Sequence, residues 1–214
     1  TGSVSGTLPV EGGDLPGVLS TGEAVNLGEI PARIGVVGTK PWEIELAQYF
    51  NAMGGRVTLV TEEARLLPEA DREISQRLAK VLHDSGVEVR RGAKVTAIRE
   101  HENDGLALTL DDGASVVVER VLASPRFPNS TGIGLRAAGV STKDGAIVVN
   151  RRMETTVPGV YAIGDVTEGP MWSHKANAEG LVAAENAMGL AGRRTREMDD
   201  RTLPRCLHSQ PEVA

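Results

Sequence analysis

Apolar and polar positions in the first half of the chain follow the order strand, helix, strand, helix. Residues 34–37 form a short apolar run typical of a buried strand, and Pro41 fits the first turn of the helix that follows. Gly54 ends that helix, and residues 56–60 supply the next strand. A second helix is predicted at about residues 71–83. This order predicts a βαβ unit, the building block of a parallel sheet.

The chain then continues with shorter extended segments. Two turn signals, Asn103-Asp104-Gly105 and Asp111-Asp112-Gly113, are typical of β-hairpins. The predicted strands lie near residues 87–90, 93–100, 106–110 and 115–123. The segments joined by these two turns are expected to form antiparallel hairpins, and together with the βαβ unit they predict the fold class α/β.

Composition narrows the class of protein. The chain has 214 residues, of which 40% are apolar and 24% charged, so it can bury a core and resembles neither a disordered nor a membrane protein. The net charge of -6 disfavours binding to nucleic acid. No apolar run is as long as a transmembrane helix, and a single cysteine argues against a secreted disulfide scaffold. We therefore expect a cytoplasmic protein without nucleic-acid or membrane partners.

The apolar run at residues 160–163 predicts a buried strand that stops at Gly164-Asp165 and leads through a loop into a helix. Gly164 lets a ligand approach the backbone closely, and Asp165 lies at the carboxyl end of the predicted strand, where ligands bind in open α/β sheets. A carboxylate only accepts hydrogen bonds, which suits the hydroxyls of a ribityl chain. With Ser173 as the N-cap of the helix, this unit can hold a flavin. The alternative is a plain strand, turn and helix with a solvated Asp.

The longer string of residues favours the flavin. Gly164-Asp165, followed by Met171, His174-Lys175-Ala176 and Glu179-Gly180, resembles the second FAD-binding motif of the pyridine nucleotide-disulphide oxidoreductases, most closely the dihydrolipoamide dehydrogenase branch. The resemblance implies that Asp165 holds the ribityl and pyrophosphate region of FAD. It also implies that the backbone from Met171 to His174 faces the flavin ring. The residues that the resemblance assigns to FAD are Thr1, Gly2, Gly164, Asp165, Met171, Trp172, Ser173 and His174.

The resemblance runs in order through nearly the whole chain and implies a βαβαβ core that carries an antiparallel meander. It also implies four parts. These are a connecting segment from the FAD domain (residues 1–31), a Rossmann-like, three-layer NAD(P)-binding-like domain (32–152), the C-terminal part of the FAD-binding domain (153–192), and a linker with the start of the dimerisation domain (193–214). The family's Cys-x4-Cys redox pair and its C-terminal His-Glu pair are not in this sequence, in which Cys206 is the only cysteine. We therefore expect an internal fragment, or the ordered part, of a longer protein, without a catalytic disulfide or catalytic His of its own.

The same resemblance implies a homodimer for the parent protein. Residues 201–214 look like the first strand of the interface domain, and a strand without neighbours leaves its backbone groups and its Leu203 and Leu207 side chains unpartnered. This tail is therefore expected to be disordered or to pack on another molecule.

The nucleotide-binding turn departs from the family pattern. Alignment on Glu45 places Gly38, Lys40 and Glu43 where a dinucleotide fingerprint has its three glycines. Lys40 puts a side chain where the pyrophosphate should touch backbone, and Glu43 puts a carboxylate at a packing contact near the positive end of a helix. A structural βαβ turn, with Lys40 solvated and Glu43 capping the helix, is favoured over normal NAD binding.

Neighbouring positions also disfavour normal NAD binding. The family's acidic residue for the ribose of NAD falls on Thr61, although the adjacent Glu62 could substitute, and no nearby Arg favours NADP. Pro125 replaces a glycine of the family's Gly-Arg-x-Pro-Asn segment and removes an N–H donor, whereas Arg126 remains. Glu45 also remains, at the family position near the nicotinamide. The NAD positions implied by the resemblance are Gly38, Lys40, Glu43, Glu45, Glu62, Pro125 and Arg126. NADH is expected to bind weakly or not at all.

Other candidate groups have simpler interpretations. Lys175, at a predicted helix start, is expected to be solvated. The histidines show no ligand spacing with Cys206, so a metal site is not expected. Trp42 and Trp172 each stand at the mouth of a nucleotide site in this interpretation and could fill space that a cofactor would take.

The sequence thus predicts part of a flavoprotein oxidoreductase similar to dihydrolipoamide dehydrogenase, with FAD in the full-length parent. Electrons would pass between NAD(H), FAD and a disulfide or dithiol substrate of the lipoyl type, with an eroded NAD fingerprint. One alternative is a non-catalytic relative that keeps the scaffold for assembly or partner binding. Another is a flavoprotein that uses a different electron donor.

Overall fold

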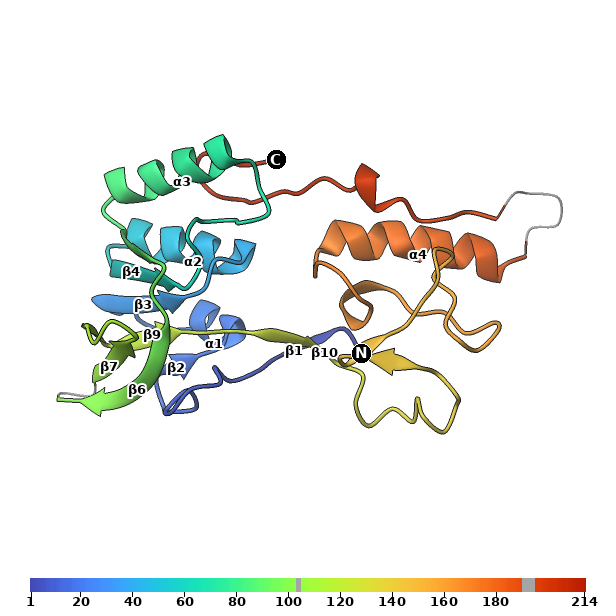
Figure 1. The fold of residues 1–214 in the computed structure, drawn as a ribbon, viewed down its shortest axis with the longest axis horizontal. Coiled ribbons are helices and arrows are strands. Elements are labelled where there is room, and N and C mark those ends of the chain that lie inside the picture. The colour runs from blue at the N-terminus through green and yellow to red at the C-terminus, as the bar shows by residue number, and fades with distance from the viewer. Residues whose placement is uncertain (103–104, 190–194) are drawn as a thin grey trace. The chain divides into compact units, whose positions relative to one another are not determined.

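The computed structural model describes residues 1–102, 105–189 and 195–214, and the chain divides into two compact units (Figure 1). The first unit comprises Thr1–Ser5 and Arg126–Pro204, and the second comprises Gly6–Pro125 and Arg205–Ala214. The limits of these units differ from those of the domains predicted from the sequence. The assignment of the predicted domains to FAD and NAD stays a prediction. The predicted limit between residues 192 and 193 lies outside the described residues.

A five-stranded parallel sheet organises the second unit. Its strands, in spatial order, are β2 (Val18–Leu19), β9 (Arg120–Leu122), β3 (Arg33–Val37), β4 (Arg56–Thr61) and β5 (Glu88–Arg91). Ile34 of β3 lies opposite Val57 of β4 on one side and opposite Arg120 of β9 on the other. The chain leaves β3 for β4 and later returns to the other side of β3 as β9. The carboxyl end of β3 is therefore a topological switch point, where open α/β sheets bind ligands.

Three helices belong to this unit: α1 (Thr21–Val25), α2 (Pro41–Ala52) and α3 (Arg72–Asp84). Helix α2 begins at Pro41 and ends ahead of Gly54, which has a φ of +94° that suits glycine. The side chain of Asp71 caps α3 by accepting the Glu73 N–H at 2.9 Å. The predicted strands and helices of the βαβ unit are confirmed, whereas α1, which is capped by Ser20, was not predicted.

The antiparallel meander is confirmed for the segments at 93–100, 106–110 and 115–118. The predicted strand at 87–90 instead lies in the parallel sheet as β5, and the predicted strand at 115–123 is divided, because residues 120–122 form β9 of that sheet. The meander consists of β6 (Val95–His101), β7 (Gly105–Leu110) and β8 (Ser115–Val118), paired in that order. The predicted turn at residues 103–104 lies outside the described residues. One apolar cluster joins α2 and α3 to the sheet, with Phe50 and Leu59 fully buried, and a second joins the sheet to the meander through Val121 and Leu108. Helices, sheet and meander are thus three layers held by two cores.

The first unit has little regular structure apart from one long helix. Its elements are the antiparallel pair β1 (Ser3–Ser5) and β10 (Arg126–Pro128), the pair β11 (Thr142–Lys143) and β12 (Ala146–Ile147), the 3-10 turns η1 (Gly164–Val166) and η2 (Asp200–Thr202), and helix α4 (Ser173–Ala187). In β1 and β10, Ser5 lies opposite Arg126, so segments far apart in sequence meet next to η1.

Two local predictions for this unit are wrong. Residues 160–163 are not a buried strand, because Tyr161 forms only a single bridge with Glu154, while Val160 and Ile163 are 41% and 40% exposed. A strand needs neighbours for its backbone groups, and an apolar run does not supply them. Ser173 is the first residue of α4 rather than its N-cap, a position that Trp172 takes without a side-chain hydrogen bond.

The C-terminal tail, residues 205–214, corrects a third prediction. Leu207 is only 2% exposed and packs in the cluster between the helices and the sheet of the second unit. It exchanges two backbone hydrogen bonds with Val213, at 2.8 and 3.1 Å. The Gln48 side chain on α2 donates to the Gln210 carbonyl and accepts the Gln210 N–H. For residues 205–214 the expectation that residues 201–214 are disordered or pack on another molecule is therefore wrong, because these residues have partners within their own unit.

Leu207→Ala is expected to release this tail. The substitution removes the buried side chain that joins the tail to the apolar core, whereas the sheet and helices keep their own contacts. Amide hydrogen exchange should then rise throughout residues 205–214 and stay unchanged in β3 and β4. Met53→Ala, at a residue that is 56% exposed, serves as the control. Unchanged protection of the tail in Leu207→Ala would contradict this account.

Candidate functional site

The Gly164-Asp165 turn is the centre of a small polar cluster in the first unit. Gly164 has a φ of +76°, which favours glycine, and opens the 3-10 turn η1. The Oδ2 atom of Asp165 accepts the Ser3 hydroxyl at 2.6 Å and lies 3.4 Å from Nη2 of Arg126. Arg126 Nη2 also donates to the Ser3 Oγ at 2.6 Å. The β1 and β10 strands therefore bring a hydroxyl and a guanidinium to the aspartate.

This cluster differs in membership from the predicted one. Ser3 was not singled out in the sequence, because hydrogen bonding across 162 residues leaves no local signal. Arg126 was assigned to the nucleotide site, and the structure brings it to Asp165; a contact of Arg126 with a nucleotide stays a prediction. Thr1 and Gly2 lie beside Asn129, which donates its N–H to the Gly2 carbonyl at 2.9 Å and its side-chain amide to the Thr1 carbonyl at 3.4 Å.

The start of α4 carries the other residues predicted to meet FAD. The rings of Trp172 and His174 stack with centroids 5.3 Å apart, and Nε2 of His174 lies 2.8 Å from the Pro204 carbonyl oxygen. Met171 is partly buried, and Ser173 is exposed at the first helical position. The side chains of Trp172 and His174 thus contact each other and Pro204, within the first unit. That their backbone faces a flavin ring stays a prediction.

Lys175 corrects a further expectation. It is not solvated: its side chain and that of Glu179 are each 4% exposed and form an ion pair with a 2.9 Å distance between Nζ and Oε1. The i,i+4 spacing was visible in the sequence, but it does not tell whether a pair faces solvent or the interior.

The arrangement fits a ligand with hydroxyl and phosphate oxygens. A Cβ atom on Gly164 would lie 3.3 Å from the Cβ of Ala176, so η1 packs directly on the first turn of α4. That helix starts without a side-chain cap, which leaves its first N–H groups for other acceptors. The Asp165 side chain is 21% exposed, and within the described residues both of its donors share Oδ2. An accessible carboxylate beside uncapped N–H groups suits the ribityl and pyrophosphate parts of FAD.

The predicted nucleotide turn in the second unit is covered by its own glutamate. Gly38 follows β3 with a φ of +122°. The Glu43 side chain folds back over it and accepts the Lys40 N–H at Oε2, at 2.7 Å. A Cβ atom built on Gly38 would lie 2.1 Å from that oxygen. A carboxylate therefore occupies the surface of the turn that a dinucleotide fingerprint keeps clear for pyrophosphate.

Burial gives Glu43 an unusual proton affinity. The residue is 4% exposed, and desolvation raises the pKa of its carboxyl to about 7, although the Lys40 N–H and the Lys40 charge lower it. Lys40 itself is exposed. This geometry agrees with the structural-turn interpretation, in which Lys40 is solvated and Glu43 caps α2. Near neutral pH the capping carboxyl is therefore only partly ionised.

The remaining nucleotide positions are dispersed over the second unit. Oε1 of Glu45, on α2, accepts the His208 N–H from the tail at 2.8 Å. Glu62 is exposed just after β4, and the Pro125 carbonyl accepts the Gly6 N–H at 2.7 Å. Glu45 thus has a structural partner that could not be predicted from the sequence. Contacts of these residues with NAD stay predictions.

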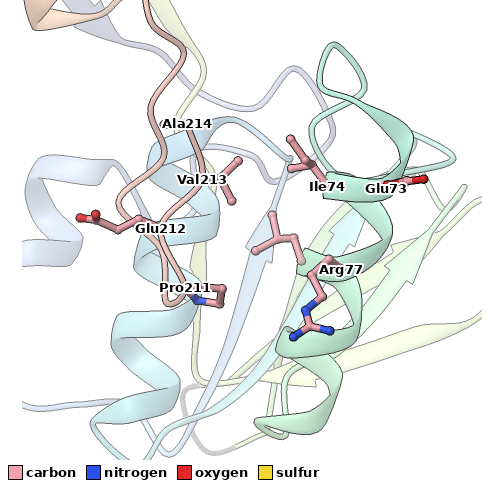
Figure 2. A pocket seen from close by; sticks show the side chains of 8 residues that line it. Glu73, Ile74, Arg77, Pro211, Glu212, Val213 and Ala214 are labelled. Carbon is pink, nitrogen blue, oxygen red and sulfur yellow. The ribbon is translucent and has the colours of Figure 1, made fainter.

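The second unit also has a groove of about 530 Å³ between α3 and the tail (Figure 2). Residues 73–78 line one side and residues 211–214 the other, and none of the predicted cofactor-binding residues takes part. Among the described residues, no three His, Cys, Asp or Glu side chains gather as metal ligands would. No helix within residues 1–102, 105–189 and 195–214 has the length and apolar character needed to cross a membrane.

Comparison with known proteins gives consistent similarities. Residues 1–180 match the family model described as pyridine nucleotide-disulphide oxidoreductase. The chain is 42% identical over 192 residues to a dihydrolipoyl dehydrogenase of Thermus scotoductus, a match that covers 86% of this chain and 40% of that protein. It is 34% identical over 219 residues to a dihydrolipoyl dehydrogenase of Bacillus subtilis, a match that covers 100% of this chain and 46% of that protein.

Among solved structures, the HOCl-induced flavoprotein disulfide reductase RclA from Escherichia coli matches with a TM-score of 0.88 and 30% sequence identity. The match covers 99% of this chain and 48% of that one. The chain therefore spans less than half the length of these relatives.

Proposed function

This chain belongs to the pyridine nucleotide-disulphide oxidoreductase family, and we propose that it is part of a FAD-dependent oxidoreductase resembling dihydrolipoamide dehydrogenase. In this proposal the full-length protein is a homodimer and transfers electrons between FAD and a disulfide or dithiol substrate of the lipoyl type. The names of the dihydrolipoyl dehydrogenase relatives support that substrate class.

The observation that carries the proposal is the Asp165 turn. Its carboxylate is held by Ser3 and Arg126 and lies next to the uncapped start of α4. Asp165 would accept hydrogen bonds from the ribityl hydroxyls, and the first N–H groups of α4 would face polarised oxygens of the cofactor. Bound FAD would supply the two-electron redox chemistry. The residues of this chain bind and orient the cofactor.

The test is whether a dithiol reduces flavin bound to the full-length protein. Anaerobic addition of dihydrolipoamide to the purified protein should bleach the flavin absorbance, and lipoamide should restore it. Glutathione serves as the comparison thiol and should act more slowly. Bound flavin that no dithiol reduces would contradict the proposed substrate class.

One observation favours a second candidate for the electron source. Glu43 covers Gly38 and takes the Lys40 N–H, so pyrophosphate would have to displace a buried carboxyl. This supports the alternative that the flavoprotein receives electrons from a donor other than NADH.

Calorimetric titration of the chain with NADH at pH 8 is expected to show weak binding or none. At that pH Glu43 is mainly ionised, since its pKa is about 7, and it repels the pyrophosphate. Lys40→Gly combined with Glu43→Gly should restore part of the affinity by clearing the turn. A dissociation constant in the micromolar range for the unmodified chain, about -8 kcal/mol, would contradict the prediction.

A further inference from the structure

The buried pair Lys175 and Glu179 holds both ends of the turn that carries Asp165. Oε2 of Glu179 accepts the Gly164 N–H at 2.6 Å, and Oε1 lies 2.9 Å from Nζ of Lys175. Lys175 donates to Oγ1 of Thr167 at 3.1 Å, and the Thr167 hydroxyl donates to the Gly164 carbonyl at 2.7 Å. The four residues form a closed ring of hydrogen bonds from α4 to the loop and back.

This ring encloses a loop of defined geometry. Gly164 and Thr167 are buried at its two ends, whereas the Asp165 side chain between them is 21% exposed. The Thr167 N–H also donates to the Gly164 carbonyl, at 2.9 Å. With both backbone groups of Gly164 engaged, the direction in which the Asp165 side chain leaves the loop is set by buried contacts of Gly164 with Glu179 and Thr167.

We propose that Lys175 and Glu179 are positioning residues for the flavin loop, defined as residues 164–167, and that Glu179 acts chiefly as the acceptor of the Gly164 N–H. The inference rests on the proposed function, because Asp165 is the residue whose position matters for FAD. Neither charge reaches the exposed side of the loop, since both side chains are 4% exposed. Their effect on a ligand is transmitted through Gly164.

The acceptor and the charge can be separated experimentally. Removing one partner of a buried ion pair leaves an uncompensated charge, whereas replacing both by neutral side chains of similar size is often tolerated. Lys175→Met with Glu179→Gln removes both charges and keeps a carbonyl acceptor for the Gly164 N–H. Lys175→Met with Glu179→Leu removes both charges and the acceptor. The two double variants have side chains of similar size and differ chiefly in whether a carbonyl accepts the Gly164 N–H.

In the full-length protein, the Gln double variant should bind FAD within about threefold of wild type, and the Leu double variant should bind roughly tenfold or more weakly, the effect of one lost hydrogen bond to a buried donor. In flavin-free protein, hydrogen exchange of the Gly164 amide should be about tenfold faster in the Leu variant alone. Glu185 lies on the same helix and forms an exposed ion pair with Arg196; Glu185→Gln breaks that pair and should change neither quantity.

Equal FAD affinity and equal Gly164 exchange in the two double variants would overturn the proposal. Hydrogen exchange at residues 182–183 reports whether α4 stays folded. If the Leu double variant loses the helix, the Glu179→Asp variant is measured in its place. Unchanged hydrogen exchange of the Gly164 amide in Glu179→Asp would then overturn the proposal equally. Wild-type protein that takes up no FAD contradicts the proposed function instead. The exchange rate of the Gly164 amide still tests the ring in that case.

Discussion

Asp165→Ala in the full-length protein is expected to weaken FAD binding about a hundredfold or more, corresponding to roughly 3 kcal/mol. The carboxylate is the accessible acceptor of the flavin loop, and its removal also ends the ion pair with Arg126 at 3.4 Å. The lost acceptor acts against a cofactor with a polyhydroxyl chain. The measurement is titration of flavin-free protein with FAD, followed by flavin fluorescence.

Two further variants separate the causes. Asp165→Asn keeps the size of the side chain and one acceptor oxygen, so it should fall between wild type and the alanine variant. Glu168→Ala removes an exposed carboxylate three residues away, in a side chain that is 81% exposed, and should have no effect. Full FAD occupancy in Asp165→Ala at low cofactor concentration would remove Asp165 from the binding site.

The stability of the second unit is expected to fall as pH rises from about 4.5 to 7, because of Glu43. Its pKa in the folded chain is about 7 against an ordinary value of 4.5, so between these values the folded chain holds a proton that the unfolded chain releases. The stabilisation is complete below pH 4.5 and is lost as the pH passes the folded pKa. A difference of this size corresponds to at most about 3 kcal/mol.

Glu43→Gln provides the comparison because glutamine keeps the side-chain size and does not titrate. Urea unfolding is measured at pH 5 and pH 8 in a Trp172→Phe background, so that Trp42 reports on the second unit. The chain with Glu43 should lose more stability between pH 5 and pH 8 than the chain with Glu43→Gln. Equal losses in both chains would mean that Glu43 has an ordinary pKa.

The helices and strands of the second unit were predictable because local signals agree with the tertiary environment there. Pro41 and Gly54 mark the ends of α2, and residues 34–37 and 57–60 are mostly apolar and lie in a buried sheet. In the first unit, residues 160–163 have the same apolar character and form no strand, because within the described residues only Tyr161 has a bridging partner. Hydrophobic periodicity and the positions of Pro and Gly indicate the secondary structure that a segment prefers. Its tertiary contacts decide which structure it forms.

The candidate site was predictable only in its central residue. Gly164-Asp165 has a recognisable local pattern, whereas Ser3 and Arg126 reach Asp165 from positions 162 and 39 residues away. The burial of Lys175 was missed because the usual behaviour of lysine at a helix start is solvation. Glu43 was identified from its place in the fingerprint, but its contact with Gly38 and its raised pKa depend on the packing of α2 against β3.

The central claim, that the full-length protein binds FAD at the Asp165 turn, is tested most directly by the amount of FAD released from the denatured protein. Protein purified under native conditions and incubated with excess FAD should, after removal of unbound cofactor, release about one FAD per chain, while the Asp165→Ala variant treated in parallel should release far less. Absence of flavin from the wild-type protein, or equal amounts from both proteins, would contradict the account.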